Sequence, residues 1–186
     1  VQLVPGEKGN RAYASWTATP AAVPGADALP QARKCAAGWG EDWKTPPTAA
    51  DIVLSERRGD ASLLLVRKDR TALTACFVLD PSEEMAAGGD LLAPDTEPPG
   101  AGRVRSDSMG AMEGPEGWYS SAMGRVGDGV TKVEVELTDG TKVQASTGGG
   151  WWAAWWPGQD GGRADGVRIV VHSGGDSKSF LPSELW

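Results

Sequence analysis

The chain has 186 residues, a mass of 19.4 kDa, a formal net charge of −7 and an isoelectric point near 4.8. That length suits a single domain with its own hydrophobic core. Nucleic acids and anionic membrane surfaces bind clustered cations, and the chain has no run of Lys or Arg, so we expect neither as a partner.

The start of the sequence bears on where the protein is located. It begins at Val1 instead of Met, and it has no signal peptide and no membrane-spanning stretch. We expect that a segment upstream of Val1 was removed, by processing or by the choice of fragment, and that any membrane anchor lies in that segment. The abundance of Gly, Ala, Asp and Arg, with Asn10 as the single asparagine, is typical of a high-GC bacterial genome.

The first part of the chain is predicted to hold two strands and a helix. The strands are residues 1–4 and residues 13–19, the second from a weak alternation. The helix is predicted over residues 28–38, with Asp27 as its cap and Gly38 as its end. Helical spacing places four side chains on the face expected to pack on a sheet: Leu29, Ala32, Cys35 and Ala36.

The next segment predicts a strand followed by a hairpin. The strand covers residues 51–56, and the hairpin arms are residues 62–67 and 71–79. Both arms carry nearly continuous apolar runs, which are typical of strands buried on both faces. The turn before the hairpin spells Arg58-Gly59-Asp60, a cell-adhesion tripeptide, but between two strands we interpret it as a tight turn.

The chain holds two cysteines, Cys35 and Cys76. A disulfide that closes a loop of about 40 residues would stabilise the fold by roughly 4 kcal/mol in the chain-entropy model. The alternative is a pair of buried free thiols. We predict the disulfide, because the rest of the composition is that of an extracytoplasmic protein. With no C-x-x-C motif and one histidine, these cysteines do not complete a zinc site.

Residues 80–117 differ from the rest of the chain, being rich in Gly, Pro and acidic side chains with little periodicity. A loop of this length in a compact domain is usually functional or disordered. We therefore predict a long acidic loop, which is either a mobile lid or partner contact, or a disordered segment. A strand over residues 118–126 is predicted to follow it.

The clearest pattern is a β-hairpin. Residues 130–138 alternate between apolar and polar side chains, and residues 141–147 alternate again after the Asp-Gly turn. A two-residue loop would set each apolar face against a polar one, so we predict a three-residue loop with Gly140 in the left-handed position. This register pairs Val135 with Val143 and Val133 with Ala145, and it sets Glu136 near Lys142.

A tryptophan-rich strand, residues 151–157, follows the hairpin. Its indoles fall on both faces, so we expect the strand to be covered on both sides or to lie at a rim. One interpretation places most indoles in the core, with one or two exposed at an edge. The other is a ligand-binding platform that stacks on sugar rings or on a partner's aromatic groups. The candidate residues are Trp151, Trp152, Trp155 and Trp156.

The remaining sequence predicts two strands, residues 167–172 and 177–181, and little chemistry. We interpret His172, the single histidine, as a structural or surface residue. The acidic turns lack the calcium-loop pattern, and nucleophile, zinc and phosphate motifs are missing, so we predict no metal site and no cofactor. A carboxylate pair for glycoside hydrolysis would have to come from the long loop, from Glu83 and Glu84 with Asp90 or Asp95.

The segment from Gly124 to Gly158 resembles a pattern of uncharacterised actinobacterial proteins, in which G-R-V-G and an alternating strand lead through D-G-T to a G-W-x-x-A-W-W-P-G strand. A weaker similarity covers residues 29–79, including Cys35 and Cys76. The resemblance implies a single-pass membrane protein with a short cytoplasmic start and an extracytoplasmic domain of this kind. It implies no catalytic residues, and it would explain both the missing start and the paired cysteines.

Together these patterns predict one mainly β domain, residues 1–186, with nine or ten antiparallel strands in a sandwich or partly closed barrel and one short helix. The preferred function is a non-enzymatic extracytoplasmic domain of a membrane-anchored protein, acting in sensing or protein–protein contact at the envelope. A carbohydrate or cell-wall binding module that uses exposed tryptophans is the alternative, and a carboxylate hydrolase is a third. The expected partner is an envelope protein or a cell-wall glycan.

Overall fold

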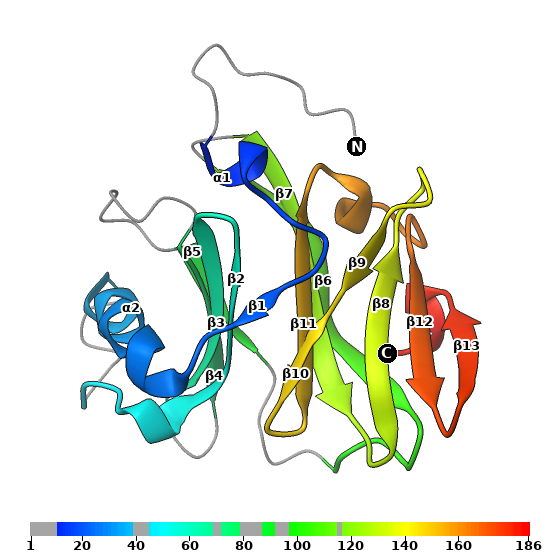
Figure 1. Cartoon of the computed structure of the whole chain (residues 1–186), viewed down its shortest axis with the longest axis horizontal. Helices are drawn as coiled ribbons and strands as arrows, with labels where there is room; N and C mark the ends of the chain where they lie inside the picture. Colours follow the sequence, from blue (N-terminus) through cyan, green and yellow to red (C-terminus); the bar gives the residue numbers. More distant parts are fainter. Residues whose placement is uncertain (1–10, 39–44, 69–71, 79–86, 92–96, 115–116) are drawn as a thin grey trace.

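The described residues form four stacked layers: a helix and three antiparallel sheets (Figure 1). The computed structural model describes residues 11–38, 45–68, 72–78, 87–91, 97–114 and 117–186. Three hydrophobic clusters fill the spaces between consecutive layers, the first between the helix and the first sheet, the next between the first and second sheets, and the last between the second and third. The prediction of a mainly β, antiparallel sandwich with one short helix is confirmed.

The first sheet has the strand order β1-β2-β3-β4-β5. The predicted hairpin with two buried arms is confirmed, because every residue of β4 and all but the last of β3 are buried between the helix layer and the second sheet. The strands are β1 (Ala21–Ala22), β2 (Ile52–Arg58), β3 (Ala61–Arg67), β4 (Leu73–Val78) and β5 (Ala87–Leu91).

The predicted helix is present as α2 (Gly25–Gly38), three residues longer at its start. The carbonyl of Pro24 accepts hydrogen bonds from the backbone N–H groups of Asp27 and Ala28, so Asp27 lies inside the first turn and is not the cap. The buried face is made of small side chains, with Ala28 buried in place of the predicted Leu29: Ala28, Ala32, Cys35 and Ala36.

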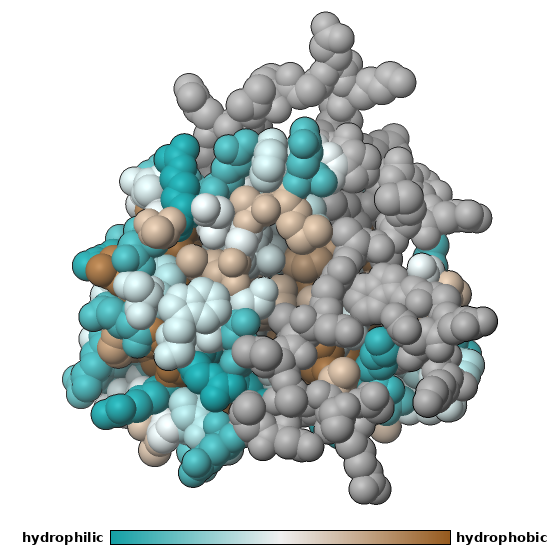
Figure 2. Space-filling view, turned by 180° about the vertical axis from the view of Figure 1, so that it is seen from behind, coloured by the Kyte–Doolittle hydropathy of each residue, from teal (hydrophilic) through white to brown (hydrophobic). Residues whose placement is uncertain are grey.

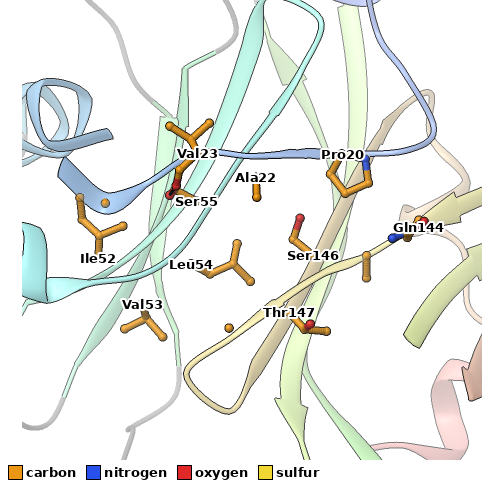
Figure 3. A pocket seen from close by; sticks show the side chains of 13 residues that line it. Pro20, Ala22, Val23, Ile52, Val53, Leu54, Ser55, Gln144, Ser146 and Thr147 are labelled. Atoms are coloured by element: carbon orange, nitrogen blue, oxygen red, sulfur yellow. Dashed lines mark hydrogen bonds between the residues drawn. The ribbon is translucent and has the colours of Figure 1, made fainter. Parts of the chain in front are cut away.

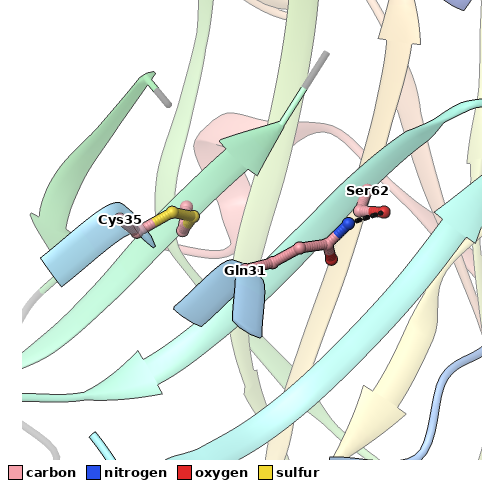
Figure 4. Close-up of a disulfide and its surroundings, with 4 residues drawn as sticks. Gln31, Cys35 and Ser62 are labelled. Atoms are coloured by element: carbon pink, nitrogen blue, oxygen red, sulfur yellow. Dashed lines mark hydrogen bonds between the residues drawn. A yellow bond between two sulfur atoms is a disulfide. The ribbon is translucent and has the colours of Figure 1, made fainter. Parts of the chain in front are cut away.

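Cys35 and Cys76 form the predicted disulfide, which joins α2 to β4 across a sequence separation of 41 residues. Both cysteines are buried in the cluster between the helix and the first sheet. Close to it, Gln31 of α2 donates a hydrogen bond to Ser62 of β3 at 3.4 Å (Figure 4). Two cross-connections therefore fix the helix on the outer face of the first sheet.

The second sheet has the order β10-β11-β7-β6, and the third has the order β13-β12-β8-β9. Their strands are β6 (Val104–Gly114), β7 (Gly117–Val126), β10 (Ser146–Gly148), β11 (Trp151–Pro157), β8 (Val130–Glu136), β9 (Lys142–Gln144), β12 (Arg168–Ser173) and β13 (Asp176–Phe180). Short helical turns complete the described elements: α1 (Arg11–Ala14), η2 (Ala49–Asp51), η3 (Asp160–Gly162) and η4 (Pro182–Glu184). No described helix is long and apolar enough to cross a membrane.

The predicted register of the central hairpin is confirmed. Val135 is paired with Val143, and the N–H of Ala145 donates to the carbonyl of Val133 at 2.9 Å. Gly140 has the expected positive φ of 85°. The second arm is not one strand, however, because the chain leaves the third sheet after β9 and joins the second sheet as β10, with Ala145 at the crossing point.

The prediction of an irregular acidic loop over residues 80–117 is wrong where the structure describes this segment, which contains β5 and the 11-residue strand β6. β6 pairs with β7 along its length, apart from a bulge at Asp107, where the register shifts. A bulge places two successive residues opposite one and so changes which face later side chains point to. That change of phase removes the period-two pattern by which a strand is detected in a sequence.

The strand predicted over residues 13–19 is also wrong. The chain has a short helix, α1, and then crosses the molecule as an extended segment, residues 15–23, which contains the two-residue strand β1 and which we call the strap (Figure 1). The rings of Tyr13 and Trp16 both pack against Trp155, with ring centroids 6.4 Å away in each case. The strand predicted over residues 1–4 lies outside the described residues.

Replacing both cysteines by alanine, Cys35→Ala with Cys76→Ala, should lower the free energy of unfolding by about 4 kcal/mol, because the unfolded chain is then unconstrained across the disulfide loop. Urea denaturation followed by tryptophan fluorescence measures this loss. A reducing agent should weaken the wild-type domain and leave the double variant unchanged. Equal midpoints for wild type and variant would show that the disulfide does not stabilise the fold.

Candidate functional site

The four candidate tryptophans lie on β11, the strand at the centre of the molecule. Trp151 and Trp155 face the first sheet, and Trp152 and Trp156 face the third. The exposed fraction is 3% for Trp151 and 0% for the other three. The prediction of a strand covered on both sides is confirmed, but the expectation that one or two indoles would be exposed at an edge is wrong. These residues form no surface platform for stacking.

The contacts of the indoles are structural. The N–H of Trp152 donates to the carbonyl of Arg105 at 3.0 Å, and the N–H of Trp16 donates to the carbonyl of Trp155 at 3.2 Å. The guanidinium carbon of Arg125 lies 4.6 Å from the ring centroid of Trp151, a cation–π arrangement. Each contact joins β11 to another segment of the chain.

Three large hydrophobic side chains are exposed among the described residues: Met112, Trp118 and Trp186. Met112 and Trp118 lie near the end of the β6–β7 hairpin, with exposed fractions of 46% and 40%. Trp118 is opposite Glu113, one register position away from the Met112–Tyr119 pair, so Met112 and Trp118 point to opposite faces of the sheet. Figure 2 shows the face opposite to that of Figure 1, where a small hydrophobic area lies near the centre with hydrophilic residues above it and to its left.

A cavity of about 380 Å³ opens between the first sheet and the edge formed by β9 and β10, and we call it the groove (Figure 3). The strap and β2 form one wall, and the chain from β9 through β10 forms the other. No charged and no aromatic side chain lines it. The lining residues are Pro20, Ala22, Val23, Gly25, Ile52, Val53, Leu54, Ser55, Gln144, Ala145, Ser146, Thr147 and Gly148.

The two walls meet at one end of the groove. Val53 is an extra residue in β2, because Ile52 is opposite Val66 and Leu54 is opposite Leu65. This bulge brings Val53 against β10, where a Cβ atom added to Gly148 would lie 2.8 Å from the Val53 carbonyl oxygen. Glycine is therefore required at this approach of the two strands.

A buried ion pair, not predicted from the sequence, lies behind the groove. Arg58 and Glu56 are both fully buried on one face of β2, and the Nε of Arg58 donates to Glu56 at 2.7 Å. The guanidinium also donates to the carbonyl of Ala18 in the strap at 2.8 Å and to that of Gln144 in β9 at 2.6 Å. The hydroxyl of Ser146, a lining residue, donates to the Glu56 carboxylate.

This network ties the first sheet to the other two, and two of its members, Gln144 and Ser146, also line the groove. Burial raises the pKa of Glu56 above its ordinary value, and the guanidinium and the Ser146 hydroxyl act against that rise. The one sequence signal was a pair of opposite charges two residues apart, on the same face of β2 as Leu54. The interpretation of Arg58-Gly59-Asp60 as a tight turn is consistent with Gly59 at φ 61°, and burial of Arg58 means that the tripeptide is not displayed as an adhesion motif.

His172 lies on the outer face of the third sheet and contacts a carboxylate. Its Nε2 is 2.7 Å from one oxygen of Glu134, and Lys132 is 2.7 Å from the other. Desolvation acts to raise the pKa of Glu134, but the hydrogen bonds from Lys132 and His172 outweigh it, so the pKa lies below its ordinary value. The arrangement is an ion-pair cluster on an open sheet face, outside the groove.

The other predicted chemistry finds no site in the described chain. Glu83, Glu84 and Asp95 lie outside the described residues, and for Asp90 only the backbone position in β5 is described. No group of three or more His, Cys, Asp or Glu side chains that could hold a metal ion occurs among the residues that the structure describes. The groove is thus the site on which the functional argument rests.

Comparison with known proteins gives no match to any family model, any curated protein or any solved structure. The actinobacterial resemblance over Gly124 to Gly158 therefore stays a prediction.

The substitution Arg58→Met should lower the free energy of unfolding by about 3–5 kcal/mol, because it leaves the Glu56 carboxylate buried without its partner. Urea denaturation is the measurement. The control is Arg57→Met, a change at the exposed neighbouring residue, with an expected effect within about 0.5 kcal/mol. A double variant with Glu56→Leu should lose less than the sum of the two single losses, and full additivity would show that the two side chains are not coupled.

The substitution Glu134→Gln should destabilise the protein at neutral pH and have less effect in acid. Since the folded-state pKa of Glu134 is lowered, its stabilising effect is complete above the unfolded value of 4.5 and is lost as pH falls through the folded value. Unfolding free energies of wild type and variant between pH 7 and pH 3 should converge. The exposed change Glu113→Gln is the control, and a constant gap for Glu134→Gln at all pH values would contradict the assignment.

Proposed function

We propose that this protein is a non-enzymatic extracytoplasmic domain of a membrane-anchored envelope protein and that it binds another protein through the groove. The observation that carries this proposal is a hollow of about 380 Å³ between strand edges that belong to different sheets. Its position between the first sheet and β10 makes it a natural contact point for a segment from another chain.

The lining of the groove favours a binding role over catalysis. None of its side chains is an acid, a base or a thiol, and catalysis by proton transfer or covalent attack relies on such groups. Of its serine hydroxyls, that of Ser55 donates to the carbonyl of Val23, and that of Ser146 donates to Glu56, which Arg58 holds in place. The Ser146 hydroxyl completes the hydrogen bonds of the ion pair.

A protein partner is better supported than a cell-wall glycan. Aromatic rings offer the flat apolar faces on which sugar rings stack, and the glycan alternative depended on exposed tryptophans. The four tryptophans of β11 are buried, and the groove has no aromatic lining residue. Backbone groups, hydroxyls and small aliphatic side chains line it instead, and these suit a polypeptide.

Two observations support a location outside the cytoplasm. The Cys35–Cys76 disulfide is typical of proteins in an oxidising compartment. The resemblance of the segment from Gly124 to Gly158 to membrane-anchored actinobacterial proteins supports the same location and an anchor in a segment outside this chain. Envelope sensing and envelope protein contact are the roles that follow for such a domain.

Site-specific photo-crosslinking in cells that produce the full-length protein tests the proposal. A photoreactive phenylalanine at Thr147, inside the groove, should form an adduct with one discrete envelope protein, identified by mass spectrometry. The same group at Lys178, an exposed residue of β13, should not form it. Ala22→Trp should abolish the adduct, because Ala22 is an exposed lining residue and an indole there occupies the groove.

The matched control for Ala22→Trp is Ala101→Trp, at an exposed turn residue that does not line the groove. It should leave the adduct unchanged. Equal adducts from Thr147 and Lys178, or an adduct that survives Ala22→Trp, would overturn the assignment of the groove as the binding site. Isolation of glycan in place of protein at Thr147 would replace the proposed partner by the cell wall.

A further inference from the structure

We infer that the groove binds its partner as an extended, uncharged peptide segment that adds a strand to the edge of β10. This inference rests on the proposed function and specifies how the same site recognises its ligand. Strand addition uses backbone hydrogen bonds for affinity and flanking side-chain contacts for specificity.

The register of β10 directs backbone groups into the groove. Gly149 and Gly150 both have positive φ, 55° and 81°, so they form a two-residue turn between β10 and β11. In such a hairpin the flanking pair, Gly148 with Trp151, is hydrogen-bonded, and the next pair, Thr147 with Trp152, is not. The N–H and the carbonyl of Thr147 therefore point away from β11, toward the hollow that Thr147 lines.

The strap already covers the edges on either side of this position. At β9, the N–H of Gln144 donates to the carbonyl of Ala18 at 2.9 Å. At β2, the N–H of Val23 donates to the carbonyl of Ser55 at 3.2 Å. An extended segment of this chain thus completes both neighbouring edges, and the edge at Thr147 faces the groove between them.

The dimensions limit the length of the added strand. β10 has three residues, and at roughly 3.3 Å per residue its edge is about 10 Å long. The contact of Val53 with Gly148 closes one end of the groove. The bound segment is therefore short, about three or four residues in register with β10, with the flanking peptide leaving through the open side.

The lining sets the chemistry of that segment. A charged side chain placed in the groove would lose water without meeting an opposite charge, and this is costly. Ala22, Val23 and Leu54 offer aliphatic contact, and Ser55 and Gln144 offer polar contact. The segment that fits has small aliphatic or hydroxyl side chains, and bulky aromatic or charged residues are excluded.

The substitution Thr147→Pro tests the strand-addition mode. Proline removes the outward N–H and adds a ring at the edge, and it is tolerated where the N–H does not bond within the sheet. The control Thr147→Val keeps the N–H. Selection of displayed random 12-residue peptides on the wild-type domain should enrich short neutral aliphatic and hydroxyl sequences, and a synthetic copy of the most enriched peptide is then the probe.

The probe should bind Thr147→Val as it binds wild type and should bind Thr147→Pro about tenfold or more weakly, since a hydrogen bond is lost and the ring obstructs the edge. A single N-methyl group should weaken binding at the probe residue that pairs with Thr147 and have little effect at either neighbouring residue, as expected of a strand bonded along one edge. This second measurement does not depend on how well the proline variant folds. Hydrogen exchange of the Thr147 amide should slow when the probe is bound.

Three results would overturn the inference: no peptide is enriched, an N-methyl group has equal effects at neighbouring probe residues, or Thr147→Pro binds the probe like wild type. Failure of this inference is distinguishable from failure of the proposed function. If the Thr147 crosslink to an envelope protein forms and Ala22→Trp abolishes it, the groove remains the binding site even when the peptide measurements fail. If that crosslink is absent, the proposed function fails as well.

Discussion

The burial of β11 on both faces is the constraint on which the rest of the structure depends. Its indoles fill two separate clusters, one shared with the first sheet and one with the third. Aromatic side chains bury more apolar area than any others, at roughly 25 cal/mol per Å², so a strand with four of them is stable only as a middle layer. The small residues Ala153 and Ala154 between the indole pairs leave room for side chains from both outer sheets.

The buried Arg58–Glu56 pair provides the polar counterpart of this apolar packing. A buried pair is favourable only when its remaining donors and acceptors are matched, and here the strap, β9 and Ser146 provide the matching groups. The pair therefore fixes the position of the first sheet relative to the other two. The groove lies beside this arrangement, because β2 and β10 approach each other at Val53 and Gly148 and are joined again through Glu56 and Ser146.

Much of the fold followed from local patterns, and most of the candidate site did not. The pairing of Val135 with Val143 was predictable, because alternation and loop length determine register within one hairpin. The strand β6 was missed because its bulge at Asp107 breaks the alternation. The groove combines residues 20–25, 52–55 and 144–148, and no single-sequence pattern connects segments so far apart. The tryptophans stood out in the sequence, but their role in the structure is packing. Thr147 had no sequence feature that indicated a binding residue.

The edges of the sheets explain why the groove is located at β10. Unpaired strand edges invite association, and proteins cover them or keep them short. In the described chain, Leu185 accepts a hydrogen bond from the N–H of Ser106 on β6, and the strap completes β9 and β2. β10 is an edge strand, as are β5 and β13, and among these three it is the one that lines the groove. With three residues it is too short to promote aggregation by itself. The β10 edge is short, lies recessed between two sheets and has no charged lining residue. It therefore excludes flat strands from other copies of the protein but admits a narrow extended segment. The same features that protect the fold therefore define what the groove can bind.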